Sequence, residues 1–228
     1  MGRRSYRIGP RSPSWCDNAP AHLRHVSMRC PVFRPVVSCL RFDAMVQDAN
    51  AAGLVTSLST VEEVLHDHAP ELGDDLIAYR NHVYRVVNLC LAIAGDGHVE
   101  VEKTAVAAVF HDLAIWTNKT FDYIAPSVAL AREYLEARGM AAWVPEVAAM
   151  IEDHHKITGI EGQSLVESFR RADWIDVSRG LRRFGLPRPF ITGVVATWPN
   201  AGFHRRLVQL TIDRFWKHPL APLPMVKW

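Results

Sequence analysis

The chain has 228 residues, of which 49% are hydrophobic and 22% are charged, and its formal net charge is +2. This length suits one domain with a sizeable core, and no run of about 18 apolar residues exists that would form a membrane-spanning helix. Residues 1–50 hold eight Arg, no Lys and three Asp, a balance of +5, so residues 51–228 carry −3. That negative balance argues against a broad nucleic-acid-binding surface, and we expect no membrane partner.

The first 50 residues form a basic leader that contains several prolines and has no sustained helical period. We interpret residues 1–50 as a disordered extension, or as the result of a start codon assigned too early, with Met45 as the true start. A transit peptide or a nucleic-acid-binding arm is the alternative. Three of the four cysteines lie here without metal-binding spacing, and Cys90 lies in an apolar run, so we expect a reducing cytoplasm. The folded domain is predicted over residues 51–228.

Helix signals follow one another from Ser59 onward. Thr60 and Glu63 have the form of a capping box, which opens a short first helix. The later helices are predicted from apolar residues at intervals of three or four positions, bounded by Gly and Pro. They cover residues 74–94, 100–115, 126–139, 145–155, 164–178 and 203–217. The predicted fold class is therefore all-α, a compact multi-helix bundle.

Several polar groups lie on the inward faces of these helices. His82 lies on the apolar stripe of its helix, and the pair His111–Asp112 lies beside the inward face of the next. The pair His154–His155 and the carboxylate of Asp173 follow apolar residues at helical spacing on two later helices. An ionised carboxylate is costly to bury without a cation or several donors. A divalent metal would satisfy these groups together, since imidazole nitrogens and carboxylate oxygens are its ligands.

Each of these residues also has an ordinary explanation when it is taken alone. A single inward histidine is more often a hydrogen-bonded core residue than a ligand, and Asp173 can pair with Arg170 or Arg171. The pair His154–His155 can be a feature of a helix C-terminus, where cations are favoured. A second His-Asp dipeptide, His66–Asp67, has no ordered ligand set behind it. The metal hypothesis therefore depends on the order of the whole set.

The order His82, His111–Asp112, Asp173 on successive helices resembles the HD-domain superfamily of metal-dependent phosphohydrolases. The segment FHDLAIWTNKTFDY and the later IEDHHK are similar to a bacterial subgroup of small HD proteins. The resemblance implies a divalent metal ion as cofactor, which can be Mn, Fe, Ni, Zn or Mg. The ligands that it implies are His82, His111, Asp112 and Asp173. Asp176, three residues later, would be an acid that supports the site without binding the metal.

The resemblance leaves the roles of His154 and His155 open. Some HD subgroups with additional histidines bind two ions, so one of the pair can ligate a second ion while the other contacts substrate or acts as an acid. The alternative is that both contact an anionic substrate as imidazolium.

The chemistry implied by the resemblance is hydrolysis of a phosphate ester, either a small phosphorylated metabolite or a nucleotide. Asp112 would orient a metal-activated water as general base. Lys156 is the better candidate to bind the phosphate, and its alternative is a lysine that favours a helix C-terminus. Arg85 is the second candidate, but Arg85 and Lys119 are equally suited to a solvated surface. The loop over residues 116–123 is expected at the mouth of the site, as a selector or lid, or simply packed onto the core.

Other functions remain in competition. The HD scaffold also supports hydration of nitriles and cyanamide-like compounds, and di-iron oxygenation, and a non-enzymatic helical ligand-binding module is the further alternative. We expect a small, anionic substrate as partner and leave the oligomeric state open. The tail over residues 215–228 is expected to pack onto the same chain.

Overall fold

The computed structural model describes residues 53–94, 101–162, 164–217 and 225. All of them belong to one structural unit, Cys39–Trp228. The predicted basic leader lies outside the described residues, as does most of the tail. Of the tail, Phe215 and Trp216 are exposed on the last helix, whereas Met225 is buried.

The described residues form helices and no β-strand, which confirms the predicted all-α bundle. Two are short 3-10 turns, at Gly73–Asp75 and Ala141–Trp143. The α-helices are α2 (Ser59–Asp67), α3 (Ala69–Leu72), α4 (Leu76–Ala94), α5 (Val101–Phe110), α6 (Ala114–Thr117), α7 (Ile124–Ala137), α8 (Val144–Asp153), α9 (Ser164–Val177), α10 (Arg188–Thr197) and α11 (Phe203–Lys217). None of these helices is long and apolar enough to cross a membrane.

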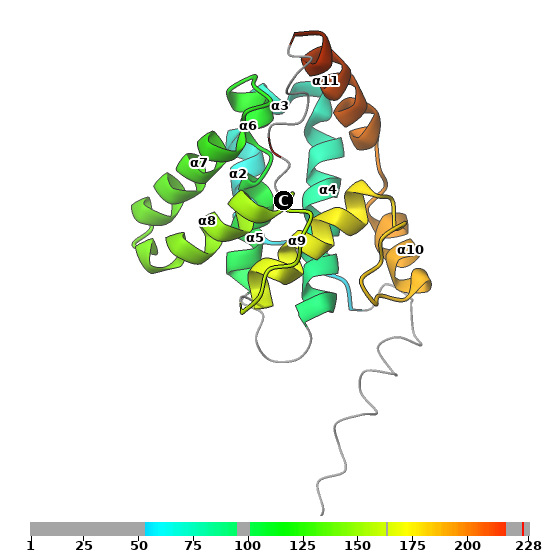
Figure 1. Cartoon of the computed structure of the whole chain (residues 1–228). Coiled ribbons are helices and arrows are strands. Elements are labelled where there is room, and N and C mark those ends of the chain that lie inside the picture. Colours follow the sequence, from blue (N-terminus) through cyan, green and yellow to red (C-terminus); the bar gives the residue numbers. More distant parts are fainter. Residues whose placement is uncertain (1–52, 95–100, 163, 218–224, 226–228) are drawn as a thin grey trace, which may run out of the picture. The chain divides into compact units, whose positions relative to one another are not determined.

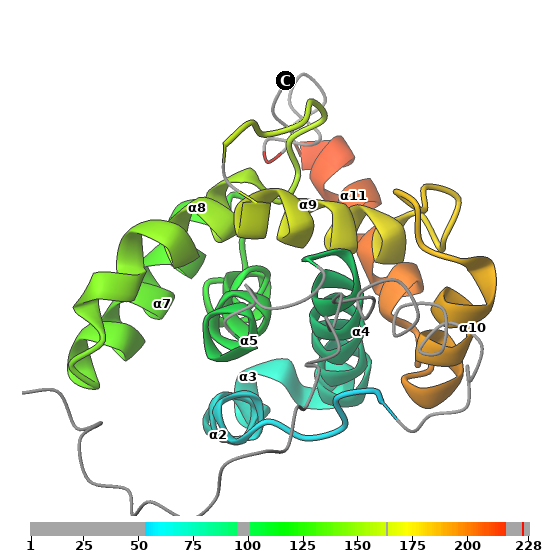
Figure 2. The same cartoon turned by 90° about the horizontal axis from the view of Figure 1, so that it is seen from below.

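Helix α4 lies in the interior of the bundle. Figure 2 shows α4 and α5 between α2 and α3 on one side and α8 and α9 on the other, and the contacts between elements agree with this order. The most extensive packing is that of α4 against α9, while α10 and α11 cover a further side of α4 (Figure 1). Because α4 is covered from several directions, its polar residues are buried along with its apolar ones: Asn81, His82, Arg85 and Asn88. Free Cys90 is buried on the same helix, as predicted.

The predicted capping box at the first helix is wrong. Helix α2 begins at Ser59, and its N-cap residue is Leu58 in an extended conformation, with no side-chain cap. Thr60 therefore lies inside the first turn, and its hydroxyl donates a hydrogen bond to Glu102 at 2.8 Å. Glu63 forms an ion pair with Arg138, the C-cap residue of α7, and does not cap the start of α2.

The helix predicted over residues 100–115 is interrupted at the His-Asp pair. Helix α5 ends at Phe110, and residues 111–113 form a turn before α6. The hydrogen bonds here join residues three apart, as in Leu113 N–H to the Phe110 carbonyl. Adjacent side chains on a continuous α-helix diverge by about 100°. In the turn they converge instead, with His111 Nε2 and Asp112 Oδ2 at 3.4 Å.

Helix α10 was absent from the sequence prediction. Its first turn follows Pro187, contains Pro189, and Gly193 lies in its interior. These residues usually mark loops, although proline is well tolerated in a first helical turn because its missing N–H has no intrahelical partner there. Burial of Ile191 and Val194 against the bundle supplies what local propensity lacks.

Candidate metal centre

Six side chains from α4, the α5–α6 turn, the end of α8 and α9 converge in the interior. They form three overlapping groups of possible metal ligands, and within each group the ligand atoms lie within 4.8 Å of one another. All except His155 are buried, and 18% of the His155 side chain is exposed. The six residues are His82, His111, Asp112, His154, His155 and Asp173.

The spacing of the first four predicted ligands suits a single ion. His82 Nε2 and His111 Nε2 lie 3.0 Å apart. Asp112 Oδ2 lies 3.7 Å and 3.4 Å from these two nitrogens, and Asp173 Oδ1 lies 3.7 Å from each. Ligands that are each about 2.1 Å from one ion lie roughly 3–3.5 Å from one another. The structure thus brings these four residues to nearly the separations that one ion requires.

The second carboxylate oxygens of Asp112 and Asp173 face the His154–His155 pair. Asp112 Oδ1 lies 3.5 Å from His154 Nε2, and Asp173 Oδ2 lies 3.7 Å from His155 Nδ1. Each aspartate therefore presents one oxygen to His82 and His111 and the other toward the His154–His155 pair. This arrangement offers two neighbouring positions for cations.

Hydrogen bonds at the far side of three imidazoles fix which nitrogen faces the centre. The Nδ1–H of His111 donates to the Ala108 carbonyl at 2.7 Å, and the Nδ1–H of His154 donates to the Ile151 carbonyl at 2.7 Å. The Nδ1–H of His82 donates to a carboxylate oxygen of Asp176 at 2.6 Å. With the proton on Nδ1, Nε2 carries a lone pair, as in most histidine ligands of metals.

Unpartnered polar atoms show that these residues fit a metal ion. Asp112 Oδ1, His154 Nε2 and both carboxylate oxygens of Asp173 are buried and have no hydrogen-bond partner. A buried polar group without a partner costs about 1–3 kcal/mol, and more when it is charged. His82 Nε2 and His111 Nε2 lie 3.0 Å from one another. A divalent cation would satisfy all of these atoms together.

The electrostatics of the centre also favour a cation. Burial raises the pKa of Asp112 and Asp173, but the neighbouring imidazoles outweigh burial and hold both pKa values below the ordinary range. Burial lowers the pKa of His111, but the two carboxylates raise it to about 9. Burial and the neighbouring His154 lower the pKa of His155 to about 3, so His155 is a neutral imidazole at neutral pH. Which of His154 and His155 contacts substrate stays a prediction.

Asp176 lies outside the centre and supports His82. Its carboxylate accepts hydrogen bonds from His82 and from Arg85, whose Nε and Nη2 lie 2.5 Å and 2.9 Å from its two oxygens. Arg85 also donates to the carbonyls of Trp198 and Pro199. The alternative that Arg85 is a solvated surface group is wrong, since Arg85 is 1% exposed. Arg85 follows His82 by three residues, so the two side chains lie on the same face of α4. This spacing is the sequence signal that could have identified Arg85 as a buried residue.

Two residues near the beginning of α11 were also missed. The ring of Phe203 stacks on His82 with centroids 4.0 Å apart, and His204 Nε2–H donates to the Asp176 carbonyl at 2.8 Å. His204 is half-buried. Nothing in the local sequence connects α11 with α4, because the contact depends on how the chain returns after α10.

The loop over residues 116–123 packs closely onto the bundle. Trp116, Phe121 and Tyr123 are all buried, and Trp116 Nε1–H donates to Asp75 at 3.0 Å. Trp116, Lys119 and Phe121 line a cavity of about 490 Å³ against α11. At the end of the loop, the Tyr123 hydroxyl reaches His155 Nε2 at 2.7 Å. A lid role for the loop remains a prediction.

Lys156 was predicted to bind the substrate phosphate. Its backbone carbonyl accepts hydrogen bonds from Arg170 Nη1 at 2.9 Å and Trp174 Nε1 at 3.2 Å, which fixes the chain directly after His155. Among the described residues, its ammonium group makes no ion pair with the six cluster side chains. Its role in substrate binding therefore stays a prediction.

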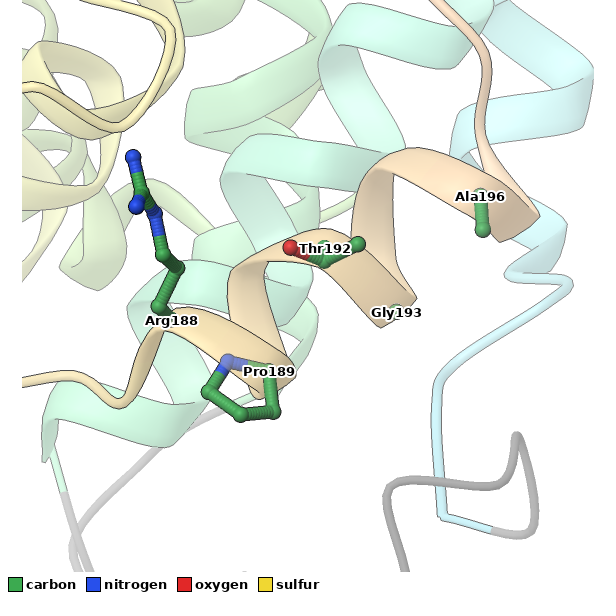
Figure 3. A pocket seen from close by; sticks show the side chains of 5 residues that line it. All are labelled: Arg188, Pro189, Thr192, Gly193 and Ala196. Atoms are coloured by element: carbon green, nitrogen blue, oxygen red, sulfur yellow. The ribbon is translucent and has the colours of Figure 1, made fainter.

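A separate hollow on α10 takes no part in the centre. Its volume is about 520 Å³, and all of its lining residues belong to α10, so it is a depression along one helix (Figure 3). Arg188 is the one charged residue among them, and none is a histidine, cysteine or acid.

Comparison with known proteins agrees with this geometry. The family model of the HD domain matches residues 79–180, which include all six cluster residues and Asp176. Searches of curated proteins and of solved structures found no match. The matched segment begins on α4 and ends directly after α9, the two helices that pack together most extensively. Residues 79–180 are therefore similar to an HD domain.

Proposed function

We propose that this protein is a metal-dependent hydrolase of a phosphate ester, either a small phosphorylated metabolite or a nucleotide. The family is that of metal-dependent phosphohydrolase-type enzymes, and the His/Asp cluster has the composition of a divalent metal site. The observation that supports the metal most directly is the set of buried carboxylate oxygens of Asp112 and Asp173 without hydrogen-bond partners.

The proposed ligands of the first ion are His82 and His111, with the carboxylate oxygens of Asp112 and Asp173 that lie 3.4–3.7 Å from the two imidazole nitrogens. A second ion would be held by His154 and His155 with the remaining oxygens of the two aspartates. A bound divalent ion supplies an acidified water and offsets negative charge on a phosphoryl oxygen.

The protein's own residues have separate tasks in this proposal. With the first ion alone bound through Asp112 Oδ2, Oδ1 is left to orient the water and accept its proton as general base. Asp176 and Arg85 keep His82 in its orientation from behind. Substrate approaches from the side of His155, the cluster residue with the largest exposure, and Lys156 follows it in sequence with an ammonium group for an anionic substrate.

Di-iron oxygenation is the second candidate function. The observation that favours it is the pair of neighbouring cation positions that share Asp112 and Asp173. Nitrile or cyanamide hydration is the candidate for a neutral substrate, which would not need Lys156. We propose a small-molecule partner, and a cytoplasmic setting in agreement with the free thiol of Cys90.

The test is a hydrolysis assay of metal-loaded wild type and Asp112→Ala against panels of phosphomonoesters, nucleotides and nitriles. We expect phosphate release by the wild type alone. Turnover of nitriles without phosphate release would replace the proposed function by hydration, and equal phosphate release by both proteins would refute the proposed site.

A further inference from the structure

Tyr123 joins the loop after the His-Asp turn to the metal centre. Tyr123 is the N-cap residue of α7 and is 1% exposed. Its hydroxyl oxygen lies 2.7 Å from His155 Nε2, with the two rings edge to face at 83°. Phe121 packs beside it with ring centroids 6.0 Å apart, so the phenol is held from the loop side as well.

His155 is oriented differently from the other histidines of the centre. His82, His111 and His154 bond their Nδ1 to an oxygen behind the ring and turn Nε2 inward. His155 turns Nδ1 toward Asp173 Oδ2 at 3.7 Å and gives Nε2 to Tyr123. Where the other rings have a carbonyl or carboxylate behind them, the ring of His155 has a phenol.

A phenol hydroxyl suits this position because it both donates and accepts hydrogen bonds. When no cation is bound, the Tyr123 hydroxyl can donate to His155 Nε2 while Nδ1 carries the ring proton. When Nδ1 is bound to a cation, Nε2 carries the proton and donates to the Tyr123 oxygen. The ring keeps one orientation in both cases, which phenylalanine at this position would not ensure.

We infer that Tyr123 is a positioning residue that holds Nδ1 of His155 toward a second metal ion, between His154 and the outer oxygens of Asp112 and Asp173. The inference rests on the proposed metal-dependent function. Tyr123 is not itself a ligand in this inference. It acts through His155, as hydrogen-bond partners of metal-bound histidines do in general.

The test compares Tyr123→Phe with wild type by calorimetric titration of the metal-free full chain with Zn²⁺ or Mn²⁺, together with elemental mass spectrometry. We expect two ions per chain in the wild type. In Tyr123→Phe the first ion binds as before, whereas the second binds about 10–100-fold more weakly. The matched control is Tyr84→Phe, which removes a phenol hydroxyl that bonds Glu62 and the Leu58 N–H and leaves the cluster untouched. It should retain both affinities.

A spectroscopic measurement separates positioning from a general loss of structure. In the Zn²⁺-loaded wild type, long-range ¹H–¹⁵N correlation of the histidine side chains should show the proton of His155 on Nε2. A proton on Nδ1 would overturn the inference even if the variant did not fold. Equal second-ion affinity in Tyr123→Phe would also overturn it.

The remaining outcomes distinguish the inference from the function on which it rests. A wild type that binds one ion per chain would overturn the role of Tyr123 and leave a mononuclear hydrolase intact. A wild type that binds no ion would overturn both.

Discussion

Two buried acids on helix α9, Glu167 and Asp173, are treated in opposite ways by the protein around them. Glu167 accepts hydrogen bonds from Arg170, from Arg171 and from the Ile160 N–H, at 2.6–3.0 Å. Asp173 lies six residues further along the same helix, and neither of its oxygens has a hydrogen-bond partner. The same helix therefore supplies donors for one carboxylate and withholds them from the other.

The difference indicates separate roles. The Glu167 network is complete within the protein, and through Ile160 it ties the segment after α8 to α9. In the proposed function, a bound cation would complete the environment of Asp173. Incomplete satisfaction of a buried charge is costly, and it is expected where a ligand is to be bound.

The largest expected effect comes from neutralising the two acids separately. Asp173→Asn should lower metal affinity and turnover by at least about 10³-fold while the fold is retained, since ligand loss removes charge stabilisation in the transition state. Glu167→Gln should leave metal content unchanged and lower stability by about 1–3 kcal/mol. Both variants are compared with wild type in metal content, turnover and urea unfolding. Metal loss of equal size in the two variants would remove the distinction between the acids.

The second effect concerns the buried pair behind His82. Arg85→Ala leaves Asp176 as a buried charge without its cation, and removing one member of such a pair costs about 3–5 kcal/mol. Arg138→Ala is the matched control, because its pair with Glu63 is solvent-exposed and should contribute less than about 1 kcal/mol. Urea unfolding at neutral pH gives both values. Equal losses would mean that the Arg85–Asp176 pair is no more important than a surface pair.

The pH dependence of stability tests whether the ionised carboxylate of Glu167 stabilises the fold. Burial raises its pKa, but the hydrogen bonds from Arg170 and Arg171 prevail and lower it from 4.5 to about 2. Because the folded-state pKa lies below the unfolded one, the stabilisation is fully present above pH 4.5 and is lost as the pH falls toward 2. The stability gap between wild type and Glu167→Gln should therefore narrow across this window. Thermal unfolding of both proteins from pH 7 to pH 2 measures this difference in stability. A difference that stays constant over this range would contradict the stabilising role of the Glu167 carboxylate.

The smallest expected effect belongs to Lys156. Lys156→Ala should raise KM for an anionic substrate about 10-fold, the size of one charged contact, with little change in metal content. Arg132→Ala serves as control, because Arg132 is an exposed cation on α7 that pairs with Glu136. Steady-state kinetics with elemental analysis measures both. Loss of metal in Lys156→Ala would mean that Lys156 has a structural task at the centre.

The sequence predicted much of the bundle because its helices follow apolar periodicity. The limits of α11 agree at both ends, and α9 differs by one residue. Helix α10 was missed because Pro187, Pro189 and Gly193 are typical of loops. The break after Phe110 was missed because the residues of the turn are compatible with a helix. Local sequence patterns do not show which residues are stabilised by packing against distant parts of the chain.

The candidate centre was predicted as a set, and of the residues that support it only Asp176 was predicted. His82, His111 and Asp173 stood out because histidines and acids on inward helix faces are unusual. Arg85 and Tyr123 did not stand out, because a buried arginine and a loop tyrosine have ordinary explanations until their partners are known. Those partners, Asp176 and His155, lie far away in sequence and only the fold brings them together.

The most direct test of the metal centre is elemental mass spectrometry of purified wild type beside His111→Ala, each before and after reloading with divalent metals. We expect one or two ions per wild-type chain and their loss in the variant, at unchanged helical content. An absence of metal from the wild type after reloading, or equal metal in both proteins, would contradict the centre and leave a helical ligand-binding module in its place.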